Sequence, residues 1–155
     1  PKGIAHALGL AEDFANNENI VVILGDNIFE DGFSEEINNF DGGSMVFLKE
    51  VPDANRFGVA ELRNGKIAGI VEKPANSKSN FALTGLYLFD HKVFGIIKAL
   101  KPSRRNQLEI TDVINNYLKD DSLKHVFVKG FWSDAGTFDS LFRAASFIKE
   151  RREKT

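Results

Sequence analysis

The run Ile20 to Leu24 constrains the fold more than any other segment, because it places five apolar residues in a row with no polar one among them. Four of the five are β-branched, which favours a strand, and the lack of alternation is typical of a strand buried on both faces of a parallel sheet. Apolar residues before it recur at helical spacing from Gly3 to Ala15. A helix that leads into such a strand predicts a three-layer α/β fold with Ile20 to Leu24 as its central strand.

Turn and cap residues divide the rest of the chain. Asn64-Gly65 suits a tight hairpin turn, so the flanking segments are expected to pair antiparallel and to make the sheet mixed. Asp90, Thr111 or Asp112, and Thr137 are expected to cap helices, the first of them from about His91 to Leu100. Residues 1–155 show no repeat or linker and are interpreted as a single domain. The further predicted strands are Ser44–Val51, Phe57–Leu62, Lys66–Val71, Phe81–Phe89 and Leu123–Val128.

The composition excludes several classes of function. Twenty basic residues against 22 acidic ones give a net charge of −2, so no basic field is available to bind a nucleic acid. The chain has no cysteine, which excludes disulfides and thiolate metal sites and suits a cytoplasmic protein. The longest apolar run is far too short to span a membrane, so no membrane partner is expected.

Two aspartates are candidate metal ligands. Asp26, with Asn27 beside it, directly follows the apolar strand, where ligands gather in open α/β sheets, and Asp134 lies just before a helix N-terminus. Taken singly, Asp26 is better explained by a chain turn, and Asp134 is explained equally well by helix capping. Two carboxylates on separate loops would suit a Mg²⁺ ion that substrate phosphates also bind.

Glu72-Lys73-Pro74 ends the second strand of the hairpin and places an acceptor beside a donor at the rim of the sheet. A carboxylate accepts hydrogen bonds from sugar hydroxyls, and an ammonium group matches a phosphate. For Glu-Lys alone, an exposed ion pair explains the sequence better. His6 lacks metal-ligand spacing to the other histidines, so a histidine metal site is excluded.

Seven motifs together resemble, in order and spacing, those of the glucose-1-phosphate thymidylyltransferases, a branch of the sugar-1-phosphate nucleotidylyltransferases. The resemblance runs nearly from end to end of the chain. The motifs are residues 1–7 (PKGIAHA), 24–27 (LGDN), 56–59 (RFGV), 72–74 (EKP), 83–87 (LTGLY), 108–112 (LEITD) and 132–137 (WSDAGT).

The resemblance implies a Rossmann-like nucleotidyltransferase fold and assigns roles to individual residues. Asp26 and Asp134 would bind the metal and, with Lys73, form the catalytic set. Glu72 and Lys73 would hold the sugar phosphate, Gly3 and His6 would face the nucleobase, and Asn27 belongs to the same substrate-binding set. The residues that would shape and line the sugar pocket are Gly58, Leu83, Thr84 and Tyr87.

The same resemblance implies that one part of the family fold is missing. The family opens with a strand and a glycine-rich loop bearing an arginine, followed later by a lysine, which together embrace the triphosphate. Nothing before Pro1 supplies them, so we expect an N-terminally truncated chain that is inactive alone. Loss of neighbouring strands would expose apolar sheet surface and favour self-association, which also leaves a homo-oligomer open.

Two classes of function remain open. The first is an enzyme that makes dTDP-glucose and pyrophosphate from glucose 1-phosphate and dTTP with Mg²⁺, with a UTP-dependent enzyme as its nearest competitor. The second is a catalytically silent relative that binds sugar phosphates or nucleotide sugars. Both metal carboxylates and Lys73 are retained, which favours the enzyme.

Overall fold

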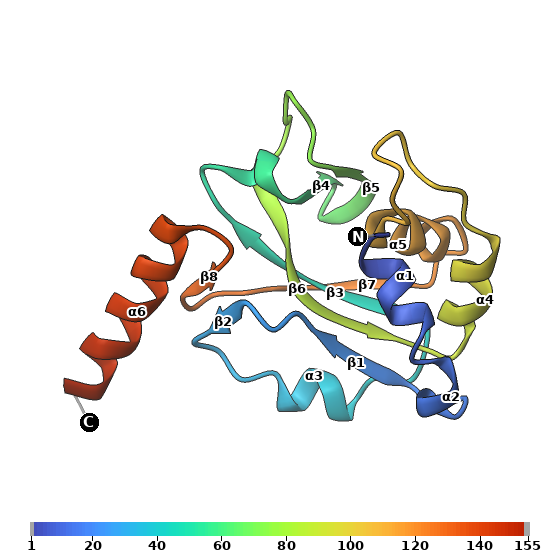
Figure 1. Ribbon diagram of the computed structural model, residues 1–155, viewed down its shortest axis with the longest axis horizontal. Coiled ribbons are helices and arrows are strands. Elements are labelled where there is room, and N and C mark those ends of the chain that lie inside the picture. Colours follow the sequence, from blue (N-terminus) through green and yellow to red (C-terminus); the bar gives the residue numbers. More distant parts are fainter. Residues whose placement is uncertain (1, 154–155) are drawn as a thin grey trace.

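The computed structural model describes residues 2–153 (Figure 1). Its strands are β1 (Ile20–Ile23), β2 (Asn27–Phe29), β3 (Ser44–Glu50), β4 (Gly58–Arg63), β5 (Lys66–Glu72), β6 (Phe81–Phe89), β7 (Leu123–Phe127) and β8 (Trp132–Asp134). Its helices are α1 (Ile4–Gly9), α2 (Glu12–Ala15), α3 (Ser34–Asn38), the 3₁₀ helix η1 (Ala54–Arg56), α4 (Lys92–Ala99), α5 (Ile110–Lys119) and α6 (Phe138–Glu153). The sequence patterns did not predict α3, β2 or β8.

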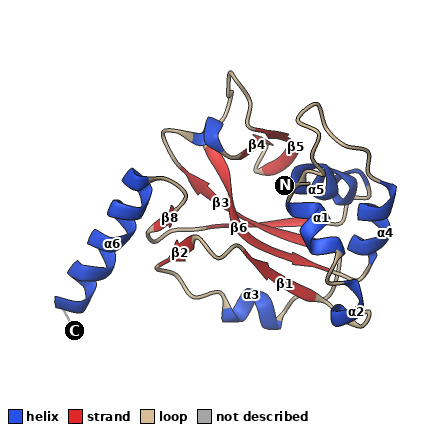
Figure 2. Ribbon diagram, viewed as in Figure 1, coloured by secondary structure: helices blue, strands red, loops and turns tan. Residues whose placement is uncertain are grey.

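A six-stranded mixed sheet forms the centre, in the order β5-β4-β6-β3-β7 with β1 beside β6, and β2 pairs with β8 in a separate ribbon. The helices α1, α4 and α5 gather on one side of the sheet (Figure 2). They bury one apolar cluster, which includes Ala5, Phe94 and Ile114, whereas Phe33 and Trp132 belong to a second cluster formed by other segments. The predicted α/β fold with a mixed sheet is therefore confirmed.

The prediction that Ile20 to Leu24 forms the central strand is wrong for the described residues. β1 pairs only with β6, and the pairing is antiparallel. Val21 is 47% and Ile23 59% exposed, whereas Ile20 and Val22 pack against the core. The run of apolar residues shows that β1 has two apolar faces, but it does not say which neighbours cover them. The central position belongs to β6, which pairs with β1, β3 and β4.

The hairpin prediction is confirmed. β4 and β5 pair antiparallel, and the turn residues Asn64 and Gly65 both have positive φ, at 51° and 76°, as a two-residue type I′ turn requires. Within residues 2–153, β3 and β7 pair parallel, and the other strand pairs of the sheet are antiparallel. The other strand predictions agree with the structure to within one or two residues.

The helix starts agree in part with the predicted caps. Thr137 caps α6, because its Oγ1 accepts from the Ser140 N–H at 3.1 Å while the Ser140 Oγ accepts from the Thr137 N–H at 3.0 Å. Asp90 accepts from the Lys92 N–H at 3.1 Å at the start of α4. Thr111 and Asp112 do not cap α5, which begins one residue earlier at Ile110. The backbone of Leu108 pairs with Lys2 and Ala5 and thereby sets the path into this helix.

Helix α6 extends away from the sheet, and its contacts are mainly with β8 (Figure 1). Phe147 stacks on Phe131 with ring centroids 4.1 Å apart, but Phe138 is 93% and Phe142 73% exposed. Among the described residues, no helix combines the length and the apolar composition that crossing a membrane requires.

Candidate functional site

A cavity of about 560 Å³ is lined by the segment from the end of β1 into β2, by η1 and the β4–β5 hairpin, and by β6, β8 and the first turn of α5. Most of the predicted site residues line it, although they come from segments far apart in the sequence. Those residues are Asp26, Asn27, Gly58, Glu72, Lys73, Leu83, Thr84, Tyr87 and Asp134.

The β2–β8 ribbon brings Asp26 and Asp134 together. Asn27 pairs with Asp134 across the ribbon, and the Ala135 N–H donates to the Asp26 carbonyl at 2.7 Å. A Cβ placed on Gly136 would lie 3.0 Å from Asp134 Oδ2 and 3.5 Å from Asp26 Oδ2. Oxygens of both carboxylates therefore lie close to one position beside Gly136, where a side chain would be crowded.

Asp134 is the more buried of the two acids, at 9% exposure. Its Oδ2 accepts from Arg56 Nη2 at 2.9 Å, but its buried Oδ1 has no hydrogen-bond partner among the described residues. A buried carboxylate oxygen without a donor is unfavourable, and a bound cation would satisfy it. Two hard oxygen donors beside this unsatisfied atom fit a Mg²⁺ ion.

No group of three or more His, Asp or Glu side chains suited to a metal ion occurs in the part of the chain that the structure describes. Mg²⁺ is usually bound by one or two carboxylates together with water and substrate phosphates. The pair Asp26 and Asp134 matches that pattern, in which the protein alone does not complete the coordination.

Asn27 fixes the geometry between the two acids and the sheet. Its Nδ2 donates to Asp26 Oδ1 at 2.8 Å. Its Oδ1 accepts from the Gly85 N–H and from Trp132 Nε1, each at 2.8 Å. The sequence placed Asn27 among the substrate-binding residues. In the structure Asn27 lines the cavity, and its side-chain amide forms these three hydrogen bonds within the protein.

Glu72, the last residue of β5, and Lys73 after it line the same cavity as the two aspartates. Lys73 is exposed and has φ of 40°, which is uncommon for a residue with a side chain, and its N–H donates to the Phe57 carbonyl at 3.0 Å. A backbone held in a sparsely populated region is frequent where a side chain must be aimed at a ligand. Lys73 therefore places an ammonium group at the cavity with an unusual but anchored backbone.

Glu72 lies near a second acid, Glu109, and near two basic groups. Burial raises the pKa of Glu72, and the charge of Glu109 raises it further, while Lys73 and Arg105 act against both. Arg105 Nη1 lies 3.2 Å from Glu72 Oε1 and 3.6 Å from Glu109 Oε1. The Ser103 hydroxyl also donates to Glu109 at 2.8 Å. These contacts hold the Glu72 carboxylate in place.

Small and apolar residues shape the rest of the cavity. A Cβ on Gly58 would meet Thr111 Cγ2 at 2.7 Å, so only glycine fits there. Burial, followed by the charges of Glu72 and Asp26, raises the pKa of Tyr87, which keeps its phenol neutral. Leu83 belongs to the same apolar cluster as Tyr87, and Thr84 Oγ1 is buried with no partner among the described residues.

Gly3 and His6 lie outside the cavity lining. Gly3 has φ of 98° and packs against the backbone of Leu108, where a Cβ would approach the carbonyl oxygen to 2.3 Å. This packing explains the glycine without a ligand. The contact of Gly3 and His6 with a nucleobase stays a prediction.

Sequence reasoning gave no role to Arg56 or Arg105, which supply the cations that pair with Asp134 and Glu72. Their partners lie 78 and 33 residues away, so no local pattern could identify these pairs. The local signals were the spacing of Asp53 and Arg56, an i,i+3 ion pair at 2.9 Å, and that of Arg105 and Glu109, an i,i+4 pair at 3.6 Å.

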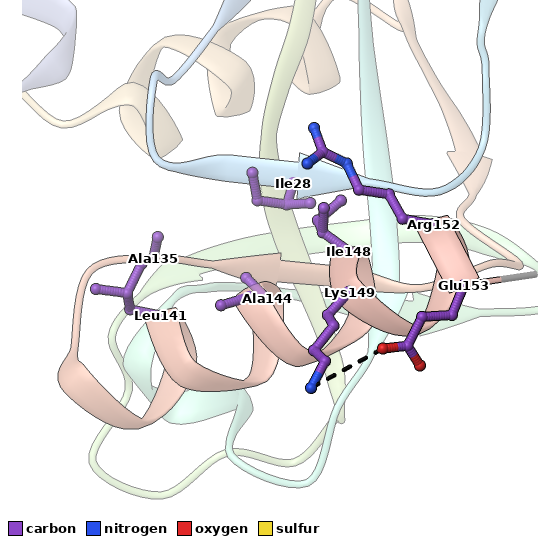
Figure 3. Close-up of a pocket in the computed structure, with 9 residues that line it drawn as sticks. Ile28, Ala135, Leu141, Ala144, Ile148, Lys149, Arg152 and Glu153 are labelled. Carbon is purple, nitrogen blue, oxygen red and sulfur yellow. Dashed lines mark ion pairs between the residues drawn. The ribbon is translucent and has the colours of Figure 1, made fainter.

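A second cavity, of about 610 Å³, lies between α6 and β2 and is mainly apolar (Figure 3). Ile28, Leu141 and Ile148 point into it, and the charged residues Lys149 and Glu153 lie at one end. Neither Asp26 nor Asp134 lines it. Although it is slightly larger, it lacks the converging polar groups that the first cavity has, so we place the candidate site in the first.

Comparisons with known proteins show what the chain is similar to. A family model described as Nucleotidyl transferase matches residues 1–151. A glucose-1-phosphate thymidylyltransferase from Neisseria meningitidis is 41% identical over 156 residues, which cover 96% of this chain and 54% of that protein. The chain thus spans about half the length of the curated relatives it matches.

Two solved structures are similar over nearly the whole chain. A candidate glucose-1-phosphate thymidylyltransferase from Bacillus anthracis, crystallised with sucrose, has a TM-score of 0.86 and 53% identity and covers 94% of this chain and 60% of its own. A UDP-glucose pyrophosphorylase bound to UDP-glucose has a TM-score of 0.83 and 27% identity, and covers 97% and 63%.

Proposed function

Since the chain belongs to the nucleotidyl transferase family, we propose that it forms the sugar-phosphate-binding and metal-binding part of a sugar-1-phosphate nucleotidylyltransferase. Within that class, glucose 1-phosphate and dTTP are the proposed substrates, and dTDP-glucose and pyrophosphate the products. One observation carries the proposal: a single cavity of about 560 Å³ brings the pair Glu72 and Lys73 together with Asp26 and Asp134.

The proposed reaction needs no covalent bond to the protein. A phosphate oxygen of glucose 1-phosphate attacks the α-phosphorus of dTTP in line, and the bond from that phosphorus to the bridging oxygen of pyrophosphate breaks. The chain contributes by positioning and by charge: Lys73 meets the sugar phosphate, and Glu72 accepts from sugar hydroxyls. Tyr87 supports this pocket as a buried, neutral ring.

Asp26 and Asp134 are the proposed ligands of Mg²⁺, which would neutralise phosphate charge when bound. The unsatisfied Oδ1 of Asp134 supports this assignment, because a buried acceptor of that kind requires a partner. Asn27 keeps Asp26 in place through the hydrogen bond to its Oδ1. The protein thus holds the acids in position before any ligand binds.

A uridylyltransferase is the second candidate, and the similarity to a UDP-glucose pyrophosphorylase favours it. Gly3 and His6, the residues proposed to face the base, lie outside the cavity, so the cavity itself does not select a base. Incubating a full-length protein that contains this chain with each nucleoside triphosphate and several sugar 1-phosphates, and weighing the products, distinguishes the two.

Lys73→Ala tests the sugar-phosphate assignment in such a full-length protein. Removing a charge-assisted hydrogen bond to the phosphate should raise the KM for glucose 1-phosphate roughly tenfold or more, because bonds to charged groups contribute about 1.5–3 kcal/mol. The KM for dTTP should change far less. Tyr87→Ala should act in the same direction through the shape of the pocket.

Lys78→Ala is the matched control, since Lys78 is also exposed and lies in the same loop but outside the cavity. Both KM values should stay near those of the unaltered protein. Equal increases in the two KM values for Lys73→Ala would show that the ammonium group does not act on the sugar phosphate.

A further inference from the structure

Arg56 holds two carboxylates at once at the edge of the cavity. Its Nη2 lies 2.9 Å from Asp134 Oδ2, and its Nη1 lies 2.9 Å from Asp53 Oδ2. The guanidinium also lies over the ring of Phe57, 5.0 Å from the centroid. Its side chain is 31% exposed, so water reaches the group and the pairing with Asp134 can be exchanged.

The oxygen that Arg56 binds is also the one that faces the second acid. The open position at Gly136 lies 3.0 Å from Asp134 Oδ2 and 3.5 Å from Asp26 Oδ2. The other oxygen of Asp26 is engaged by Asn27. A divalent cation that binds Asp26 Oδ2 and the Asp134 carboxylate, whether through its unpartnered Oδ1 or through Oδ2, would therefore meet a guanidinium already bound to that carboxylate.

We propose that Arg56 is a counter-ion that competes with the divalent cation for Asp134, and that Asp53 receives the guanidinium when the cation binds. The proposal rests on the metal site proposed above. While no cation is bound, Arg56 balances the charge of a nearly buried carboxylate, which would otherwise be unfavourable.

This competition has a consequence for the order of binding. Two carboxylates and an adjacent guanidinium attract a free divalent ion less than two carboxylates alone. A cation that arrives with the phosphates of a substrate brings extra negative charge, which offsets the repulsion from Arg56. The arrangement therefore favours entry of the cation together with a phosphate-bearing substrate over binding of the cation alone.

The test is direct binding of Mn²⁺ to the 155-residue chain without any nucleotide. Binding is measured by electron paramagnetic resonance, as the decrease in the signal of free Mn²⁺. Arg56→Met should bind Mn²⁺ about fivefold more tightly or better, the size expected for removing one partly exposed charge. Arg63→Met, at the exposed far end of β4, is the matched control and should bind like the unaltered chain.

Two further variants separate the inference from the proposed metal site. Asp53→Asn removes the carboxylate that would receive the guanidinium when a cation binds. Arg56 then stays on Asp134, so Mn²⁺ should bind more weakly. Asp134→Asn should abolish the binding. If Asp134→Asn binds as the unaltered chain does, the metal site itself is wrong. If it abolishes binding while Arg56→Met and Asp53→Asn leave the affinity unchanged, only the role of Arg56 is wrong.

Arg56→Lys is a second, more conservative variant, for use if Arg56→Met does not fold. A lysine keeps the charge but has no planar fork for two carboxylates, so the affinity should lie between those of the unaltered chain and Arg56→Met. Circular dichroism confirms that each variant is folded. Should Arg56→Met fail to fold, Asp53→Asn and Arg56→Lys decide the question, and unchanged affinity in both overturns the proposal.

Discussion

The side-chain amide of Asn27 connects the acids of the site to the sheet. Its oxygen accepts from the Gly85 N–H on β6 and from the Trp132 indole on β8, and its nitrogen donates to Asp26. Networks of this kind rigidify a site because each member limits the freedom of the next. The position of the Asp26 carboxylate thus depends on a residue that does no chemistry itself.

Gly85→Ala tests that dependence. A Cβ on Gly85 would lie 2.4 Å from Asn27 Nδ2, which is closer than two non-bonded atoms can approach. The amide must therefore move, and its hydrogen bonds must break. Overpacking together with lost hydrogen bonds should lower the free energy of unfolding by roughly 2–4 kcal/mol. Urea denaturation of both proteins measures the difference.

Gly95→Ala on α4 is the control, because a Cβ there meets no atom within 4 Å. Alanine in a helix should raise the free energy of unfolding by about 0.5–1 kcal/mol relative to glycine. Equal urea midpoints for Gly85→Ala and the unaltered chain would show that the amide can move without loss.

Glu72 makes a second prediction, which concerns pH. Its pKa is raised by burial and by Glu109, so folding favours the protonated form. The stabilisation that results is fully present at pH values below the ordinary pKa of 4.5 and is lost as pH rises through the raised pKa. As pH rises from 4.5 through the raised pKa of Glu72, the unaltered chain should therefore lose stability relative to Glu72→Gln.

Urea denaturation from pH 4 to neutral pH measures this difference. Glu35→Gln, on the exposed surface of α3, controls for the loss of a carboxylate in general. A difference between the unaltered chain and Glu72→Gln that is the same at every pH would contradict a raised pKa at Glu72.

At the scale of elements, β1 is an edge strand with exposed apolar side chains. It pairs with β6 on one side, and Val21 and Ile23 are exposed. Unpaired backbone groups beside apolar side chains favour pairing with another chain. Replacing both residues with lysine should lower self-association, measured by sedimentation velocity, and change stability by less than about 1 kcal/mol, since both side chains are half exposed.

The double variant Asn38→Lys and Asn39→Lys adds the same charge on the polar, exposed end of α3. Its self-association should remain that of the unaltered chain. If both double variants reduce association equally, net charge and not the β1 edge is responsible.

Local patterns predicted the elements whose causes are local. The β4–β5 hairpin depends on two turn residues with positive φ, and the cap of α6 depends on Thr137 and Ser140, three residues apart. The start of α5 and the place of β1 depend on partners far along the chain, such as Lys2 for Leu108, and no local pattern specifies them.

The same distinction applies to the site. Glu72 ends β5 and Asp26 lies in the short turn after β1, so a sequence pattern identifies both as residues near the end of a strand. Arg56 was missed because its role depends on Asp134, which the β2–β8 ribbon brings to the same cavity. Neither strand of that ribbon has more than three residues, too few for hydrophobic alternation to reveal it.

At the scale of the whole molecule, the cavity is rich in acids and poor in bases. Among the described residues that line it, the basic side chains are Arg56 and Lys73, against the acids Asp26, Glu72 and Asp134. Arg56 is already shared by two carboxylates. One basic group is thus left for a sugar phosphate, and a nucleoside triphosphate, with its several negative charges, would meet no further cation in this lining.

We therefore predict that the 155-residue chain does not turn over by itself, although it binds glucose 1-phosphate or dTDP-glucose weakly through Glu72, Lys73 and Tyr87. Positioning of reactants contributes roughly 7–11 kcal/mol to barrier reduction, and each preorganised donor about 3–4. At about 1.4 kcal/mol per tenfold in rate, the absence of several triphosphate donors corresponds to many decades. Pyrophosphate release from dTTP, glucose 1-phosphate and Mg²⁺ should stay at background, while the full-length Neisseria meningitidis relative serves as the positive control. Robust release by the 155-residue chain would mean that its own residues bind the triphosphate, at a place other than the cavity around Asp26 and Asp134.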